Sequence, residues 1–158
     1  MEQLLITKAS IGDAELIHTM QVESFQPLLD KYKDFGTNPA NEGIERTIER
    51  LNQKQTDYYL ISYQTNPVGA IRIAKRDNHR YRLSPIFILP EYQGRGIAKA
   101  TIQIVEEIYT DWLVWELDTI LEECKLCGLY ESLGYITTGK ITAINDNMRI
   151  VFYEKHKV

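Results

Sequence analysis

The hydrophobic positions of the chain follow two periodicities, one typical of strands and one typical of helices. Apolar runs predict strands over residues 4–6, 58–63, 68–74, 81–89, 114–119, 135–144 and 148–153. Helical spacing predicts four helices: from the N-cap Asp13 to about residue 25, over 44–51, from 97 to about 112, and over 124–133. Turns are predicted at Pro27, at 35–39, at Asn66-Pro67, at 76–79 and at 145–147. No linker or repeat interrupts this order, which predicts a single α/β domain over residues 1–158.

The predicted strand over residues 81–89 contains a proline, which is unusual inside a sheet. Pro85 has no N–H to donate to a neighbouring strand, and prolines in sheets are normally found at edges or bulges. The polar pair Ser84-Pro85 also separates Leu83 from the apolar run that follows. We interpret this as a bulge, or a separation of neighbouring strands, that leaves backbone groups for another partner. The alternative is an edge strand that tolerates its proline.

A glycine-bearing turn follows this strand and leads directly into the third predicted helix. It reads Gln93, Gly94, Arg95, Gly96, Ile97 and Ala98. A strand, a glycine turn and a helix in this order aim free N–H groups and the positive end of the helix dipole at one point, which favours a phosphate group there. The Gly-Lys of a Walker loop and the third glycine of the dinucleotide fingerprint are both missing. The alternative is an ordinary turn between a core strand and a core helix.

The longer string around this turn resembles the acetyl-CoA signature of the GCN5-related N-acetyltransferases (GNAT). The matching positions are Ile88, Pro90, Gln93, Gly94, Gly96, Ile97 and Ala98. The resemblance implies a mixed, mostly antiparallel α/β (α+β) sheet of about seven strands flanked by about four helices. It implies acetyl-CoA as co-substrate, bound by Ile86, Phe87, Ile88, Gln93, Gly94, Arg95, Gly96, Ile97, Ala98 and Lys99. In the family, an N–H of the bulged strand polarises the oxyanion, and the matching group is that of Ile88.

A second motif, over residues 129–135, resembles the Leu-Tyr-x-x-x-Gly-aromatic pattern of the same family. The match assigns Tyr130 as the general acid beside the CoA sulfur. A tyrosine has a pKa of about 10 and a thiol about 8.5, so Tyr130 would act mostly through a hydrogen bond to the developing thiolate. The alternative is a helix tyrosine packed before a glycine cap. Many relatives carry an asparagine seven positions earlier, where this chain has Glu123, and an ionised carboxylate cannot donate a hydrogen bond.

No general base is assigned by the sequence. Some relatives place a carboxylate or a histidine at the positions of Arg82 or Ser84, and Arg82 cannot take up a proton. Glu23, Glu116 and Asp118 could face a cleft, but we interpret each as a solvated surface charge.

Composition and charge narrow the partners further. The 158 residues carry a net charge of -4, which argues against a general nucleic-acid binder. No apolar stretch approaches the roughly 18 residues of a membrane span, and the N-terminus lacks the features of a signal peptide, so we expect a cytoplasmic protein. Cys124 and Cys127 form a lone C-x-x-C without a second pair of ligands, so no metal is expected and both are interpreted as helical cysteines.

The sequence therefore predicts an N-acetyltransferase that moves the acetyl group of acetyl-CoA to a primary amine. The acceptor could be a small molecule or a protein, and the resemblance is compatible with a homodimer. Two alternatives stay open: a catalytically silent acyl-CoA sensor, and an interaction domain that keeps the fold and uses exposed tyrosines.

Overall fold

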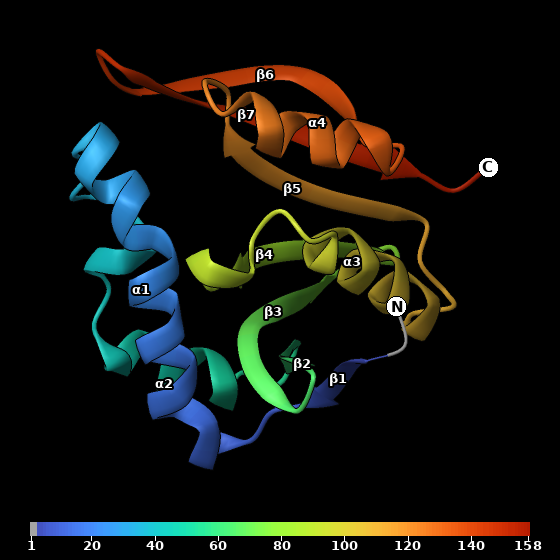
Figure 1. Cartoon of the computed structure of the whole chain (residues 1–158). Coiled ribbons are helices and arrows are strands. Elements are labelled where there is room, and N and C mark those ends of the chain that lie inside the picture. The colour runs from blue at the N-terminus through green and yellow to red at the C-terminus, as the bar shows by residue number, and fades with distance from the viewer. Residues whose placement is uncertain (1–2) are drawn as a thin grey trace.

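The computed structural model describes residues 3–158, which form one seven-stranded sheet with helices against both faces (Figure 1). The strands are β1 (Leu4–Lys8), β2 (Thr56–Tyr63), β3 (Asn66–Arg76), β4 (Arg80–Ile88), β5 (Val114–Ile120), β6 (Ile136–Asn145) and β7 (Met148–His156). The helices are α1 (Ala14–Tyr32), α2 (Ile44–Asn52), α3 (Ile97–Ile108) and α4 (Cys124–Ser132), with short 3₁₀ turns at Ile11–Asp13, Pro39–Asn41 and Pro90–Tyr92. The predicted fold class and element order are confirmed.

The sheet is antiparallel except at its centre, where β4 and β5 run parallel. The strand order is β1-β2-β3-β4-β5-β7-β6. Pairing between β4 and β5 extends only from Arg80, opposite Val114, to Arg82, opposite Glu116. Beyond Arg82 the two strands separate, as Figure 1 shows. We call this separation the splay; it leaves one side of the second half of β4 without a neighbouring strand among the described residues.

The bulge predicted at Ser84-Pro85 is confirmed by the register of β4. Ile86 pairs with Ile71 of β3 and Leu83 pairs with Ile73, so three steps along β4 correspond to two along β3. The Ser84–Pro85 peptide is cis. Because β4 has a strand on each side at its start, the edge-strand alternative is excluded.

The two sides of the sheet have separate cores. Ile102 of α3 and Tyr130 of α4 pack with the β-strand residue Trp115, whereas Ile17 of α1 packs with Phe87 of β4 on the opposite side. The consecutive β4 residues Phe87 and Ile88 belong to opposite cores, as expected for a strand between two layers of helices.

Gly69 permits the close approach of β3 to the end of β4. A Cβ on this glycine would lie 2.0 Å from the carbonyl oxygen of Phe87. Such a contact is far shorter than any tolerated distance, so only glycine allows β3 to lie this close to Phe87. The sequence requirement at Gly69 thus helps to fix the position of the strand end that borders the splay.

Three predicted boundaries are wrong. Helix α1 does not end near residue 25 but continues through Pro27 to Tyr32. One lost backbone hydrogen bond at a proline is outweighed here because Leu29 and Tyr32 become buried. The β2–β3 hairpin turns at Gln64 and Thr65, which have positive φ, and not at Asn66-Pro67, which begin β3. Helix α3 ends at Ile108, before the predicted end near 112.

Candidate active site

The end of β4 presents backbone groups to the splay. The N–H of Leu89 donates to Val68 O of β3 at 2.7 Å, so the alternating Ile88 directs its N–H and C=O to the other side. The carbonyl of Ile88 accepts a hydrogen bond from Nε2 of Gln93 at 2.9 Å. The N–H of Ile88 faces the splay, where β5 no longer pairs with β4 among the described residues. This N–H therefore has no strand partner on the side of the splay among the described residues.

The glycine turn has the conformation expected of an anion cradle. Gly94 and Gly96 have φ of 76° and 79°, in the left-handed region that favours glycine. Gly96 is the N-cap of α3, no side chain caps this helix, and its first turn contains no acidic residue. A Cβ on Gly94 would meet no atom within 4 Å, so the space over the turn is open. Free N–H groups at a helix start beside open space fit a pyrophosphate, and these residues would hold that part of CoA.

Two cations flank this turn. Arg95 lies 5.3 Å from the ring centre of Tyr92 and donates to Glu91 O at 3.2 Å. Lys99 is exposed on the first turn of α3 and forms no ion pair within residues 3–158. Neither cation has a carboxylate partner among the described residues, so both are available to pair with a phosphate group.

Tyr130 is buried in an aromatic cluster on the other side of the splay. Its ring lies edge-on to Tyr135, with centroids 6.1 Å apart, and 6.3 Å from the ring of Tyr153. Burial, with the charge of Asp118 and the nearby Cys127, raises the pKa of Tyr130 far above its ordinary value. The hydroxyl therefore stays protonated at neutral pH, and it makes no hydrogen bond to the residues that the structure describes. It is available to donate to a ligand atom.

Glu123, which replaces the asparagine of many relatives, links two helices. Its carboxylate accepts hydrogen bonds from Nζ of Lys31, at 2.7 Å, and from the hydroxyl of Tyr32. These hydrogen bonds lower the pKa of Glu123, so it remains ionised at neutral pH. The residue thus fastens the start of α4 to the end of α1, which accounts for a carboxylate at this position.

The acidic residues of the splay are paired, contrary to their interpretation as solvated charges. Asp118 of β5 forms an ion pair with Arg82 of β4 at the point where the strands separate. Glu116 contacts Nε of Arg76 and Nη2 of Arg80, both at 2.9 Å. These ion pairs join β3 and β4 to β5, which lies far along the chain. The sequence alone does not give the register of these strands, so it could not predict the pairs. Glu23 is exposed on α1, as predicted.

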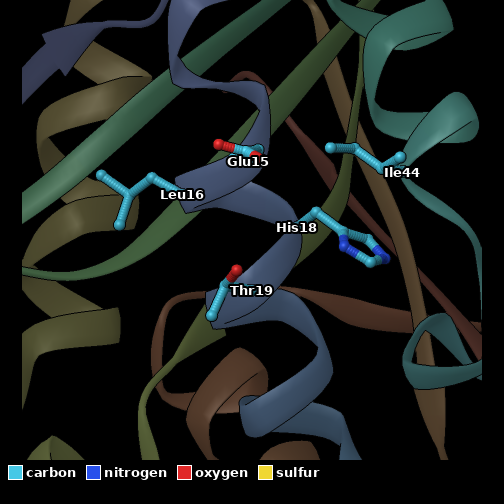
Figure 2. Close-up of a pocket in the computed structure, with 5 residues that line it drawn as sticks. All are labelled: Glu15, Leu16, His18, Thr19 and Ile44. Carbon is cyan, nitrogen blue, oxygen red and sulfur yellow. The ribbon is translucent and has the colours of Figure 1, made fainter.

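Two hollows lie outside the cradle itself. One, of about 460 Å³, lies between the start of α1 and α2, and Figure 2 shows His18 and Ile44 facing each other across it. Nε2 of His18 is already 2.9 Å from Glu42 O, and none of the predicted site residues lines this hollow. The other, of about 250 Å³, lies beside the splay between β5, β6 and β7 and is lined by Arg82, Phe152 and Lys140 among others.

The cysteines lie on α4, as predicted, and neither is part of a metal cluster among the described residues. Cys127 is buried, with Sγ 3.6 Å from Ile120 O, whereas Cys124 is exposed at the start of the helix. Within residues 3–158, no helix is long and apolar enough to cross a membrane.

A strand bulge, a splay and a glycine cradle at the start of α3 are the features that the sequence motifs predicted. The family model described as the acetyltransferase (GNAT) family matches residues 22–135. The chain belongs to this family. Members of the GNAT family use acetyl-CoA, so this GNAT protein is an acetyltransferase with acetyl-CoA as co-substrate.

Solved GNAT structures share the fold over nearly the whole chain. Spermidine N-acetyltransferase from Vibrio cholerae, in complex with CoA and spermine, superposes with a TM-score of 0.78 at 18% identity, covering 99% of this chain and 96% of that one. The ribosomal-protein-S18-alanine N-acetyltransferase from Escherichia coli has a TM-score of 0.78 at 11% identity, covering 97% and 93%. An acetyltransferase from Thermus thermophilus has a TM-score of 0.75 at 15% identity, covering 98% and 97%. No curated protein sequence gives a significant match.

Proposed function

We propose that this GNAT protein transfers the acetyl group directly from acetyl-CoA to a primary amine, with Ile88 and Tyr130 acting on the thioester. The observation that carries the proposal is a pair of hydrogen-bond donors without partners in residues 3–158. One is the N–H of Ile88 on β4, and the other is the hydroxyl of Tyr130 on α4. They belong to the two elements that border the splay, beside the glycine cradle of α3.

The proposed chemistry has three steps, and these residues assist the first two. The neutral amine nitrogen attacks the thioester carbon, and the N–H of Ile88 stabilises the oxyanion that forms. The carbon–sulfur bond then breaks, and the hydroxyl of Tyr130 donates a hydrogen bond to the leaving thiolate. The proton of the attacking amine leaves to solvent, because no carboxylate beside the splay is unpaired among the described residues: Glu116 and Asp118 both form ion pairs with arginines.

The paired carboxylates favour an α-amine acceptor over a polyamine. An alkyl amine with a pKa near 10.4 is neutral to only about one part in 2,500 at pH 7, whereas an α-amine with a pKa of about 7.7–8.0 is neutral to roughly one part in ten. Without a free base, the second class reacts more readily. Among the described acidic residues beside the splay, Glu116, Asp118 and Glu154 each have an arginine partner, so none is unpaired to hold a polycation.

The test measures acetyl-CoA binding by calorimetry and thiol release from acetyl-CoA with a panel of amines. The panel contains spermidine, an amino-acid amide, and short peptides that begin with alanine or serine. We expect binding, and amine-dependent thiol release that is fastest with the α-amines. Binding without release by any amine would favour the acyl-CoA sensor, and absence of binding would contradict the proposal altogether.

A further inference from the structure

Arg72 of β3 lies directly opposite the bulge of β4. Its neighbours Ile71 and Ile73 pair with Ile86 and Leu83, so Arg72 is the residue at which the register shifts. The extra residue of a bulge leaves backbone groups out of the ladder. One such group is the carbonyl of Ser84, which accepts a hydrogen bond from Nη1 of Arg72 at 2.8 Å.

The guanidinium of Arg72 is fixed by other neutral groups. Its Nη2 lies 3.2 Å from Oε1 of Gln53 and 3.4 Å from Oγ1 of Thr56, at the end of α2 and the start of β2. Burial, together with the nearby charge of Arg50, lowers the pKa of Arg72, but an arginine remains charged at neutral pH. Within residues 3–158 it forms no ion pair with a carboxylate. This partly buried charge thus has backbone and neutral side chains as its partners.

The bulge decides which residues of β4 face the splay. Leu83 packs in the core beneath α3, and Ile86 and Ile88 pack in the same core, whereas Phe87 packs against α1. Without the extra residue, strict alternation from Leu83 would place Phe87 beneath α3. The N–H of Ile88 would then turn toward β3 and be lost to the splay. The bulge is therefore a requirement for the oxyanion donor.

We propose that Arg72 is a positioning residue for acetyl transfer: its hydrogen bond to Ser84 O holds the bulge in the register that aims the N–H of Ile88 at the thioester carbonyl. Arg72 acts through its contact with the backbone of β4, and the proposal assigns it no contact with the cofactor. The charge-assisted bond is stronger than a neutral one, so it can fix a backbone segment that lacks regular pairing. The inference rests on the proposed function, since it assumes that Ile88 donates to bound acetyl-CoA.

The test uses acetyl-CoA with a ¹³C-labelled thioester carbonyl and needs no acceptor. Wild type, Arg72→Met, Arg72→Lys and the control Arg46→Met are compared, since Arg46 is an exposed arginine of α2 that contacts only Glu49 among the described side chains. Infrared difference spectra report the carbonyl stretch of the bound cofactor, and calorimetry reports the Kd of CoA and acetyl-CoA. Circular dichroism shows whether each variant is folded.

We expect the bound carbonyl stretch to lie below that of free acetyl-CoA in wild type and in Arg46→Met. In Arg72→Met it should move back toward the free value, and Arg72→Lys should restore part of the difference. The Kd of CoA, which has no thioester carbonyl, should change less than about twofold, while turnover with an active amine falls roughly tenfold or more in Arg72→Met.

Three results would overturn the inference. A folded Arg72→Met variant with the wild-type stretch would show that Arg72 does not aim the donor. An unshifted stretch in wild type would remove Ile88 from the mechanism while leaving acetyl-CoA binding intact. Absence of acetyl-CoA binding in wild type would instead contradict the proposed function and the inference with it. If Arg72→Met does not fold, Arg72→Lys carries the comparison.

Discussion

Tyr130 and Tyr153 lie in the same aromatic cluster, with ring centroids 6.3 Å apart, but their hydroxyl groups have different partners. The hydroxyl of Tyr153 donates to Oε2 of Glu131 at 2.8 Å. That of Tyr130 has no hydrogen-bond partner within residues 3–158, and it is not among the fully buried polar atoms, so a solvent or ligand atom can reach it although the residue as a whole is buried. An accessible donor on an otherwise buried ring is free to hydrogen-bond a ligand atom, which favours a functional hydroxyl over a packed tyrosine.

The matched pair Tyr130→Phe and Tyr153→Phe separates these two roles. Tyr130→Phe should lower kcat at least about tenfold, which is about 1.4 kcal/mol of transition-state stabilisation. Its unfolding free energy should change by less than about 0.5 kcal/mol, because no protein hydrogen bond is lost. Tyr153→Phe should lose about 1 kcal/mol of stability and keep its kcat. Thiol-release kinetics and urea unfolding measure both, and unchanged turnover in Tyr130→Phe would remove this residue from the mechanism.

At the scale of elements, the end of α1 spans the splay. Tyr32 packs with Ile120 of β5 and Met148 of β7, and Asn145 of β6 donates from its side chain to Tyr32 O at 2.9 Å. Together with the contacts of Glu123, these fasten α1 to the half of the sheet that carries Tyr130. Helix α1 therefore bridges the two strands between which acetyl-CoA is proposed to lie.

Glu123→Gln tests this bridge through its pH dependence. The folded-state pKa of Glu123 is lowered by the hydrogen bonds of Lys31 and Tyr32, so its contribution to stability is present above the unfolded value near 4.3. The contribution is lost as the pH falls through the lower folded value. We expect Glu123→Gln to be about 1 kcal/mol less stable than wild type at pH 7, with the difference shrinking below pH about 4.

The control for this comparison is Glu107→Gln, an exposed glutamate of α3 without an ion pair among the described residues. It makes the same charge change and should match wild-type stability at both pH values. Equal stability of Glu123→Gln and wild type at pH 7, measured by urea unfolding, would show that the bridge contributes nothing.

Short sequence patterns predicted the features that depend on neighbouring residues. They failed where packing against residues far along the chain determines the structure. Pro85 indicated the bulge because a proline has no N–H to pair with a neighbouring strand, whatever the rest of the fold. Gly94 and Gly96 indicated the turn because glycine readily adopts the positive φ found there. The end of α1 was wrong because burial of Tyr32 depends on β5 and β7, far along the chain. The pair between Arg82 and Asp118 depends on strand register, which no short window contains.

At the scale of the whole molecule, the sheet has two parts, a first part of β1–β4 and a second part of β5–β7, and few backbone hydrogen bonds join them. The parallel pairing of β4 and β5 covers only Arg80 to Arg82, and Arg80 adds ion pairs to Glu116 at 2.9 Å and Glu154 at 2.7 Å. Hydrogen bonding along the whole length of β4 and β5 would close the splay, so the proposed site requires that this pairing stay short. The stability of the first part must therefore come from contacts at a distance from the splay.

One such group of contacts lies beyond the far end of α3. Tyr109, just after this helix, donates to Oδ2 of the buried Asp57 at 2.6 Å and lies 2.8 Å from the hydroxyl of Tyr59. Lys8 and Lys75 contact the same carboxylate at 3.1 and 3.5 Å. The group joins β1, β2 and β3 to the end of α3. Because α3 has 12 residues, it lies about 18 Å from the glycine cradle at the other end.

Tyr109→Phe should therefore weaken the fold without weakening the site. Burial alone would raise the pKa of Asp57, but the hydrogen bond from Tyr109 and the lysines outweigh it and lower the pKa. The stabilisation is present above the unfolded pKa near 3.9 and is lost as the pH falls through the folded value. We expect a loss of about 1–3 kcal/mol at pH 7, shrinking in acid, and a Kd for CoA within about twofold of wild type. Urea unfolding and calorimetry measure the two quantities, and a large loss of CoA affinity in a folded variant would show that this distant group supports the cradle as well as the fold.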